Sequence, residues 1–241
     1  MTKHSKKKLL WLIPVLLLAM VIASVCYVND YYHTDTSVEQ YLEDSETVKV
    51  KNVDVGLFLD GPGNDQAMIF YPGAKVEYTA YVPLLHKLAE QGVDVFLVKM
   101  PCNLAFLGQN KASDIMELHE YAHWYIGGHS LGGAMAASFA AKQGENLDGL
   151  VLLAAYPTRQ LPQKDFSVVS IYGSEDGVLN MEKLESGHAY MPKDYTEICI
   201  DGGNHAQYGN YGVQKGDGEA RITREEQQKQ TVEAILRIMK K

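Results

Sequence analysis

Ser130 is the residue of this chain whose surroundings most clearly favour chemistry. Residues 127–133 read Gly-Gly-His-Ser-Leu-Gly-Gly and contain the pattern G-x-S-x-G. This pattern is typical of a sharp turn from a strand into a helix that exposes a serine hydroxyl at its tip. Gly128 and Gly132 suit such a turn, because a Cβ at either position would clash with neighbouring backbone. A serine hydroxyl is a weak nucleophile near neutral pH, so Ser130 needs a general base, and the base needs an orienting group.

His205 and Asp176 are the candidates for the base and for its orienting acid. Asp176 follows the apolar run 167–172, and His205 follows the run 197–200. In an open α/β sheet, functional groups collect in loops at the carboxyl ends of strands. The order Ser130, Asp176, His205 along the chain therefore predicts a serine–histidine–aspartate triad.

Other acids and histidines remain as alternatives. Glu175 and Asp201 are the other carboxylates that could orient the base. Five other histidines are less suitable as the base because of where they lie in the sequence: His4, His33, His86, His129 and His188.

Two backbone N–H groups are needed to stabilise an oxyanion. Leu131, which follows the serine at the positive end of its helix, supplies the first. The second is expected from the turn 71–75, and we predict the N–H of Ala74.

A zinc site is the competing interpretation. Residues 119–123 read His-Glu-Tyr-Ala-His and match H-E-x-x-H, and His129 stands where a longer zinc-protease pattern has its third ligand. That longer pattern has glycine at 126, where this chain has Ile126, a β-branched residue that resists positive φ. The metal scheme also leaves Asp176 and His205 without a role, so no metal is expected.

Alternating strand and helix patterns must position these residues. Short apolar runs predict strands at 48–53, 55–60, 67–71, 93–98, 124–127, 150–155, 167–172 and 197–200. Helices are expected at 81–88, at 111–122, after Ser130, and after a capping box formed by Thr223 and Glu226. Near-continuous apolar strands predict an α/β fold with a mostly parallel sheet of about eight strands, flanked by helices.

The combination resembles the α/β-hydrolase superfamily, in its small, lidless form similar to dienelactone hydrolases and carboxylesterases. The resemblance runs from Ile69 to Met239 and rests on Tyr71-Pro72-Gly73, the serine turn, Gly173-x-x-Asp176 and Asn204-His205. Pro72-Gly73 stands where the family commonly has His-Gly, and residues 156–165 leave no room for a lid. The resemblance implies hydrolysis of an ester or similar acyl bond through an acyl-enzyme, without a cofactor. Acyl transfer to an alcohol and a catalytically silent binding protein are the alternatives.

The N-terminus is organised differently from the rest. Residues 9–28 carry no charge and are about 30 Å long as a helix, which matches the bilayer core. Four lysines lie within residues 1–8, so the positive-inside rule predicts a cytoplasmic tail and export of the remainder. We favour a retained membrane anchor over a cleaved signal peptide, followed by an acidic stalk at 29–47 and the hydrolase domain at 48–241.

Charge and cysteines narrow the possible partners. The chain has a net charge of −8, and its first 30 residues hold four lysines and one aspartate, which leaves −11 for the remainder. Such an acidic domain is a poor nucleic-acid binder, so the expected partner is a small or lipid-like acyl substrate. Cys102 and Cys199 are expected to be unpaired and buried. Loops 101–110, 156–165 and 206–221 are expected to form the pocket walls.

Overall fold

The computed structural model describes residues 3–239, with side chains from residue 13 onward, and it divides into two units after Tyr31. The first unit contains helix α1 (Lys3–Asn29), which includes Pro14. Among the residues with described side chains, no helix combines the length and the apolar character needed to cross a membrane. The side chains of the predicted cytoplasmic tail, 1–8, and of the first part of the predicted anchor, 9–12, lie outside the described residues.

The second unit is built on one eight-stranded sheet with the order β1-β2-β4-β3-β5-β6-β7-β8. The strands are β1 (Lys49–Val53), β2 (Gly56–Asp60), β3 (Gln66–Tyr71), β4 (Asp94–Val98), β5 (His123–His129), β6 (Gly149–Leu153), β7 (Ser167–Gly173) and β8 (Thr196–Ile200). Only the β1–β2 and β2–β4 pairs of this sheet are antiparallel, and the other pairs are parallel. The prediction of a mostly parallel sheet of about eight strands is confirmed.

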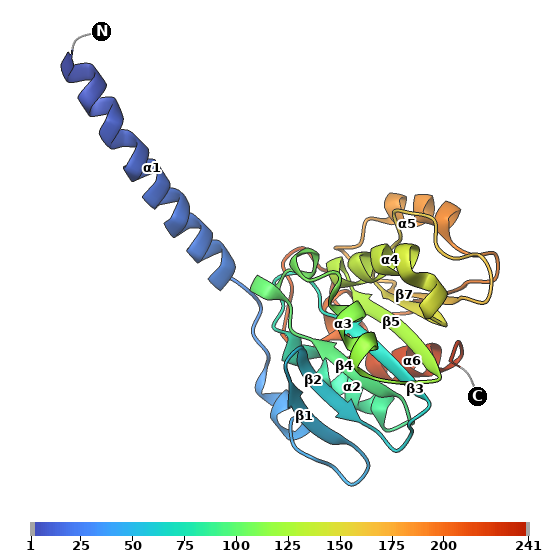
Figure 1. Cartoon of the computed structure of the whole chain (residues 1–241). Helices are drawn as coiled ribbons and strands as arrows, with labels where there is room; N and C mark the ends of the chain where they lie inside the picture. The colour runs from blue at the N-terminus through green and yellow to red at the C-terminus, as the bar shows by residue number, and fades with distance from the viewer. Residues whose placement is uncertain (1–2, 240–241) are drawn as a thin grey trace. The chain divides into compact units, whose positions relative to one another are not determined.

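Helices cover both faces of this sheet (Figure 1). They are α2 (Val82–Ala89), α3 (Lys111–Leu118), α4 (Leu131–Gln143), α5 (Met181–Gly187) and α6 (Arg224–Leu236). Side chains alternate between the faces along each strand. In β3, Met68 and Phe70 join the core cluster under α2 and α6, whereas Ile69 and Tyr71 join the cluster under α3 and α4. The carboxyl ends of the parallel strands therefore meet at one edge of a sheet that is buried on both sides.

The ends of two helices can be compared with their predicted positions. Helix α6 begins as the capping pattern predicts, since the N–H of Glu226 donates to Oγ1 of Thr223 at 3.2 Å. Helix α3 ends at Leu118, four residues earlier than expected. His119 is already extended, with φ −133° and ψ 144°, because residues 119–122 lead directly into β5.

The predicted stalk is largely part of the compact unit, which is a correction to the expected boundary at residue 48. This unit begins at Tyr32, which pairs with Val76 in a parallel bridge. Val38 and Val48 are fully buried in the core cluster under α2 and α6. Arg224 also contacts the carboxylate of Asp35 at 2.8 Å. The predicted stalk is held by the burial of Val38 and by the Asp35–Arg224 ion pair, which its acidic composition did not indicate.

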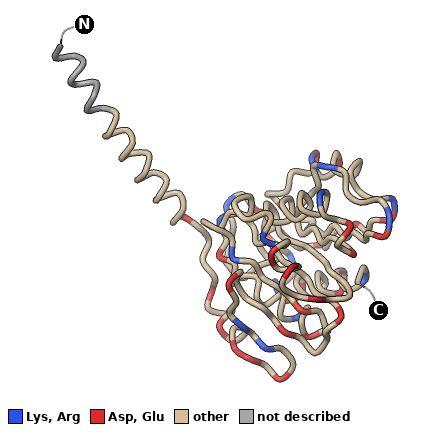
Figure 2. The backbone as a smooth tube through the Cα atoms, in the orientation of Figure 1, with Lys and Arg blue, Asp and Glu red and all other residues tan. Residues whose placement is uncertain are grey.

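The prediction that Cys102 and Cys199 are buried is wrong, although both are unpaired as expected. Cys199 lies on β8, the last strand of the sheet, and alternation that buries Ile200 turns Cys199 outward. Cys102 lies in a surface turn with φ 53°. Figure 2 shows Asp and Glu positions spread along the backbone of the domain, as its acidic composition requires.

Candidate active site

Ser130 occupies a sharp turn between β5 and α4. Its backbone has φ 53° and ψ −121°, a conformation that costs free energy for a residue with a side chain. A Cβ on Gly132 would lie 2.1 Å from the carbonyl oxygen of Tyr71, and one on Gly128 would lie 2.6 Å from the same oxygen. The strand, the turn and the helix can pack this closely only because both positions are glycine.

Asp176 and His205 contact each other, as the order along the chain suggested. Nδ1 of His205 and Oδ2 of Asp176 are 2.9 Å apart, and each side chain is 1% exposed. The other carboxylate oxygen of Asp176 accepts the N–H groups of Val178 at 2.9 Å and Leu179 at 2.8 Å. These bonds fix the carboxylate, so the carboxylate can in turn fix the orientation of the imidazole.

The alternative acids lie on the surface and bind a different partner. Glu175 and Asp201 contact Arg221 at 2.9 Å and 2.6 Å. Among the other histidines, His188 contacts Glu197 at 2.8 Å. Of the three carboxylates considered, Asp176 is the one that the structure brings to His205.

Ser130 and His205 line one cavity of about 230 Å³. In the described part of the chain, Nε2 of His205 is buried and has no hydrogen-bond partner. The remaining lining residues are Leu131, Ala134, Ala154, Ala155, Tyr156, Val178, Leu179 and Asn180. Of the loops expected to form the walls, only 156–165 contributes, through Tyr156. The segment 178–180 was missed, although it directly follows the predicted acid.

The turn expected to supply the second oxyanion donor has one N–H group free. The N–H of Gly73 donates to the hydroxyl of Tyr81 at 3.1 Å, and that of Lys75 donates to the carbonyl of Asn103 at 2.8 Å. Ala74 lies between them, and its N–H has no partner among the hydrogen bonds of the described chain. The N–H of Leu131 is the first in helix α4 and has no intrahelical acceptor.

His129 and Tyr81 connect this turn to His205. The hydroxyl of Tyr81 lies 2.8 Å from Nδ1 of His129 and also accepts the N–H of Gly73, so its own proton points to Nδ1. The rings of His129 and His205 are 4.4 Å apart between centroids. Burial, followed by the nearby His205, lowers the pKa of His129 well below its usual value, so His129 is neutral near pH 7.

One further part of the site, Asp217, was not found from the sequence. Oδ1 of Asp217 accepts the N–H groups of Gly177 at 3.2 Å and His205 at 3.1 Å, and Oδ2 accepts that of Ala206 at 2.8 Å. Asp217 thus joins the loop of the acid to the loop of the base. Its only sequence signal is the turn Gly216-Asp217-Gly218. Tyr208 and Tyr211, in the loop 206–221 that was expected to form a pocket wall, are buried in the core.

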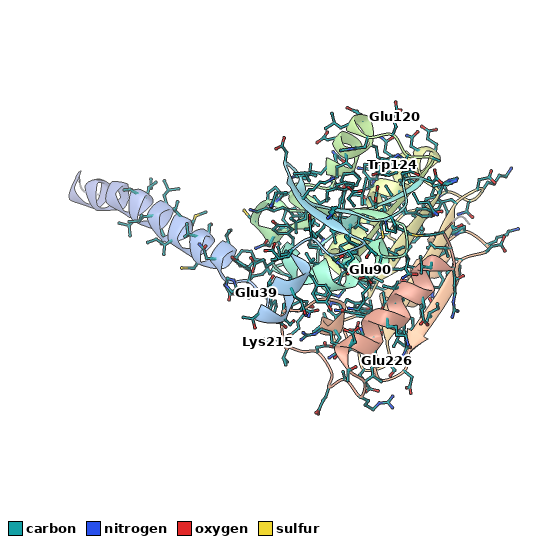
Figure 3. The ribbon with its side chains drawn as sticks, turned by 90° about the horizontal axis from the view of Figure 1, so that it is seen from below. Glu39, Glu90, Glu120, Trp124, Lys215 and Glu226 are labelled. Atoms are coloured by element: carbon teal, nitrogen blue, oxygen red, sulfur yellow. The ribbon has the colours of Figure 1, made fainter. Side chains whose placement is uncertain are left out.

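The H-E-x-x-H pattern does not form a zinc-binding helix. Residues 119–122 are not helical, and His123 is the first residue of β5, hydrogen-bonded to Asp148 at 3.1 Å. Glu120 is exposed on the outside of the domain (Figure 3). His129 ends the same strand, about 20 Å from His123 at the usual rise of a strand. His123 and His129 therefore cannot bind one metal ion together.

Comparison with known proteins gives a family and a fold. Residues 67–229, more than half of the chain, match the Alpha/beta hydrolase family. No curated protein matches the chain. A predicted CIB-like hydrolase from Thermoplasma acidophilum has a similar structure, with a TM-score of 0.59 and 16% identity over 80% of this chain and 99% of its own.

Two other solved structures are similar at about the same level. Dienelactone hydrolase from Anabaena variabilis has a TM-score of 0.55 and 12% identity over 81% of this chain and 100% of its own. Carboxyl esterase 2 from the mycorrhizal fungus Tuber melanosporum also has a TM-score of 0.55 and 12% identity, over 85% of this chain and 91% of its own. At such identities the similarity concerns the fold.

Proposed function

The chain belongs to the Alpha/beta hydrolase family, and from that premise we propose that it is a serine hydrolase that cleaves an ester or a related acyl bond. One observation carries the proposal. Ser130, in the strained turn after β5, lines the same cavity as His205, whose other ring nitrogen is bonded to the buried Asp176. A serine nucleophile needs a base that is oriented by an acid, and the His205–Asp176 pair in the cavity of Ser130 supports this role.

The proposed reaction proceeds through an acyl-enzyme. Nε2 of His205 takes the proton of Ser130 while Oγ forms a bond to the acyl carbon. When the bond to the alcohol oxygen breaks, His205 returns that proton to the leaving alcohol. A water molecule, deprotonated by His205, then attacks the acyl carbon and releases the carboxylic acid and free Ser130. Asp176 keeps the proton of the imidazole on Nδ1 and stabilises the imidazolium.

The negative oxygen that forms in each step needs donors that are already in place. We assign this role to the N–H groups of Leu131, which lines the cavity, and of Ala74, which belongs to the turn whose Tyr71 and Pro72 carbonyls pack against Gly132 of α4. The position of Leu131 at the N-terminus of α4 adds the helix dipole to its hydrogen bond. No metal or organic cofactor enters this mechanism.

We also propose that residues 9–28 tether the domain to a membrane, with the domain on the extracytoplasmic side. The uncharged run and the four preceding lysines support this. Membranes from cells that express the full chain should retain it in the pellet after extraction at alkaline pH. Release of the full-length chain into the supernatant would contradict the tether.

Turnover of a panel of simple esters tests the proposed reaction. Ser130→Ala and His205→Asn should each lower kcat by roughly 10⁴–10⁶, as in other triads. Ser138→Ala, two turns along α4 and outside the cavity lining, is the control and should keep the activity. Turnover that survives Ser130→Ala but is lost with a chelator would contradict the proposal. An added alcohol that appears in a new ester product would show acyl transfer instead of hydrolysis.

A further inference from the structure

The cavity beside Ser130 has features that restrict the substrate. We propose that it is the acyl-binding site and that it selects a short, uncharged acyl group of about two to six carbons. This inference rests on the proposed function, because it takes Ser130 as the residue that becomes acylated. It adds the chemical class of the group that Ser130 receives.

The size of the cavity limits the length of the group. Its volume is about 230 Å³, below the range of about 300–1,000 Å³ typical of pockets for drug-sized ligands. At about 30 Å³ for a group the size of a water molecule, it holds roughly seven or eight non-hydrogen atoms. A carbonyl group with up to six carbons fits within that limit, whereas a long fatty-acyl chain would have to leave most of its carbons outside the cavity and in contact with water.

The residues that line the cavity disfavour a charged acyl group. Apart from the reacting His205, none of the ten lining residues is acidic or basic. The carboxylate of Asp176 lies behind His205, with its oxygens bonded to His205, Val178 and Leu179. A charged acyl group would lose its hydration and find no counter-charge, which is costly. An apolar group instead gains by burial against Leu131, Leu179 and the alanines.

Several residues that line the cavity are held in place by hydrogen bonds of their backbone. Ala134 comes from the first turns of α4, and Ala154 and Ala155 follow the end of β6. Ala154 has φ 47°, and its N–H donates to the carbonyl of Ile171 at 2.8 Å. Val178 and Leu179 are held by the hydrogen bonds that their N–H groups donate to Asp176. Walls fixed in this way cannot widen easily for a longer chain, so the dimensions of the cavity should act as a real limit.

The experiment measures kcat/KM of the full chain in detergent with p-nitrophenyl esters of increasing acyl length. The acetyl, butyryl and hexanoyl esters should be hydrolysed best, with a fall of at least about tenfold at octanoyl and a larger fall at lauroyl. The pentanoyl and hemisuccinyl esters have similar size, and the charged hemisuccinyl ester should be at least about tenfold worse. A lauroyl ester preferred over the butyryl ester, or equal rates for the hemisuccinyl and pentanoyl esters, would overturn the proposal.

Two substitutions that change the cavity volume in opposite directions test whether the cavity causes the chain-length preference. Ala134→Leu should fill it and move the preference to acetyl, with at least about a tenfold loss on the hexanoyl ester. Leu179→Ala should enlarge it and raise the octanoyl rate relative to the butyryl rate by several-fold. Ser138→Leu, one turn further along α4, is the matched control and should leave the profile as in the wild type. Chain-length profiles identical in all four proteins would overturn the assignment of the cavity.

A small fluorophosphonate separates failure of this inference from failure of the proposed function. Labelling of Ser130 together with an unexpected chain-length profile would overturn only the acyl-binding assignment. No labelling and no ester turnover in the wild type would overturn both.

Discussion

At the scale of single residues, the candidate site depends on hydrogen bonds that place reacting groups before any substrate arrives. The Tyr81 hydroxyl is the least expected of these, because it joins the N–H of Gly73 in the oxyanion turn to Nδ1 of His129. The same hydroxyl would lie 2.8 Å from a Cβ on Gly73. We therefore propose that Tyr81 positions the peptide that presents the N–H of Ala74.

Tyr81→Phe tests this role. Without the hydroxyl, the N–H of Gly73 loses its acceptor and the turn can rotate, so the N–H of Ala74 is no longer held toward the oxyanion. We expect kcat to fall about tenfold, less than the 10²–10³ observed when an oxyanion donor itself is removed, with KM nearly unchanged. Steady-state kinetics on a butyryl ester provides both values.

The control for that variant is Tyr121→Phe. It removes another partly buried hydroxyl, which bonds Asp94 at 2.6 Å near the amino end of β5. Tyr121→Phe should lower stability without a selective loss of kcat. Equal kinetics for Tyr81→Phe and the wild type would show that the hydroxyl does not position the turn.

The sequence predicted residues whose chemistry is distinctive and missed those that act only through position. Asp176 and His205 could be assigned because each follows an apolar strand, and the structure brings them to 2.9 Å. Tyr81 and His129 could not be assigned. One lies in a 3₁₀ turn (Tyr78–Tyr81) and the other ends β5, and only the packing of the two elements joins them.

At the scale of elements, the site is an assembly of loops that follow β3, β5, β7 and β8. The loops after β7 and β8 carry Asp176 and His205, the proposed acid and base, and Asp217 joins these loops by accepting N–H groups from Gly177, His205 and Ala206. Asp217 lies in a turn with no other predicted role. Its carboxylate accepts hydrogen bonds from backbone N–H groups that have no carbonyl partner in these irregular loops.

Asp217→Ala should therefore damage both stability and activity. Several N–H groups lose their acceptor at once, which we expect to cost about 3 kcal/mol in free energy of unfolding. The kcat should fall because the acid and base loops are no longer held together. Denaturant unfolding and ester kinetics measure the two effects.

Asp201→Ala is the matched control for Asp217→Ala. Asp201 is an exposed carboxylate on the same loop that pairs with Arg221 on the surface, and such pairs contribute little. If both variants behaved like the wild type, Asp217 would have no structural role in the site.

Strands were easier to predict than the ends of helices. The parallel strands are continuous apolar runs because both of their faces are covered, and that pattern is visible in the sequence. The sequence pattern did not indicate where α3 ends. Residues 119–122 have helix-compatible side chains, but the chain must extend there to enter β5.

At the scale of the whole molecule, the main revision concerns where the domain begins. The acidic composition of 29–47 suggested a stalk, yet Val38 is buried in the core and Asp35 pairs with Arg224. One buried valine in a largely polar segment gives too weak a pattern to predict burial. The fold class itself was predictable because it depends on many strands and helices rather than on one side chain.

Truncated chains test the revised boundary. A chain that starts at residue 32 should remain folded, whereas one that starts at residue 48, the expected boundary, loses the burial of Val38. At about 1.5–3 kcal/mol for a buried valine, we expect a loss of about 1.5–3 kcal/mol in free energy of unfolding. Urea unfolding of the two chains provides the comparison. Equal midpoints of unfolding would show that the segment before the expected boundary adds no stability, as in a stalk.

The central claim is that Ser130 is the nucleophile, and covalent labelling tests it most directly. The full chain should react with a fluorophosphonate probe, and peptide mass spectrometry should find the adduct on Ser130. Labelling should disappear in Ser130→Ala, persist in Ser138→Ala and be unaffected by a chelator. An adduct on another residue, or labelling that persists in Ser130→Ala, would contradict the account.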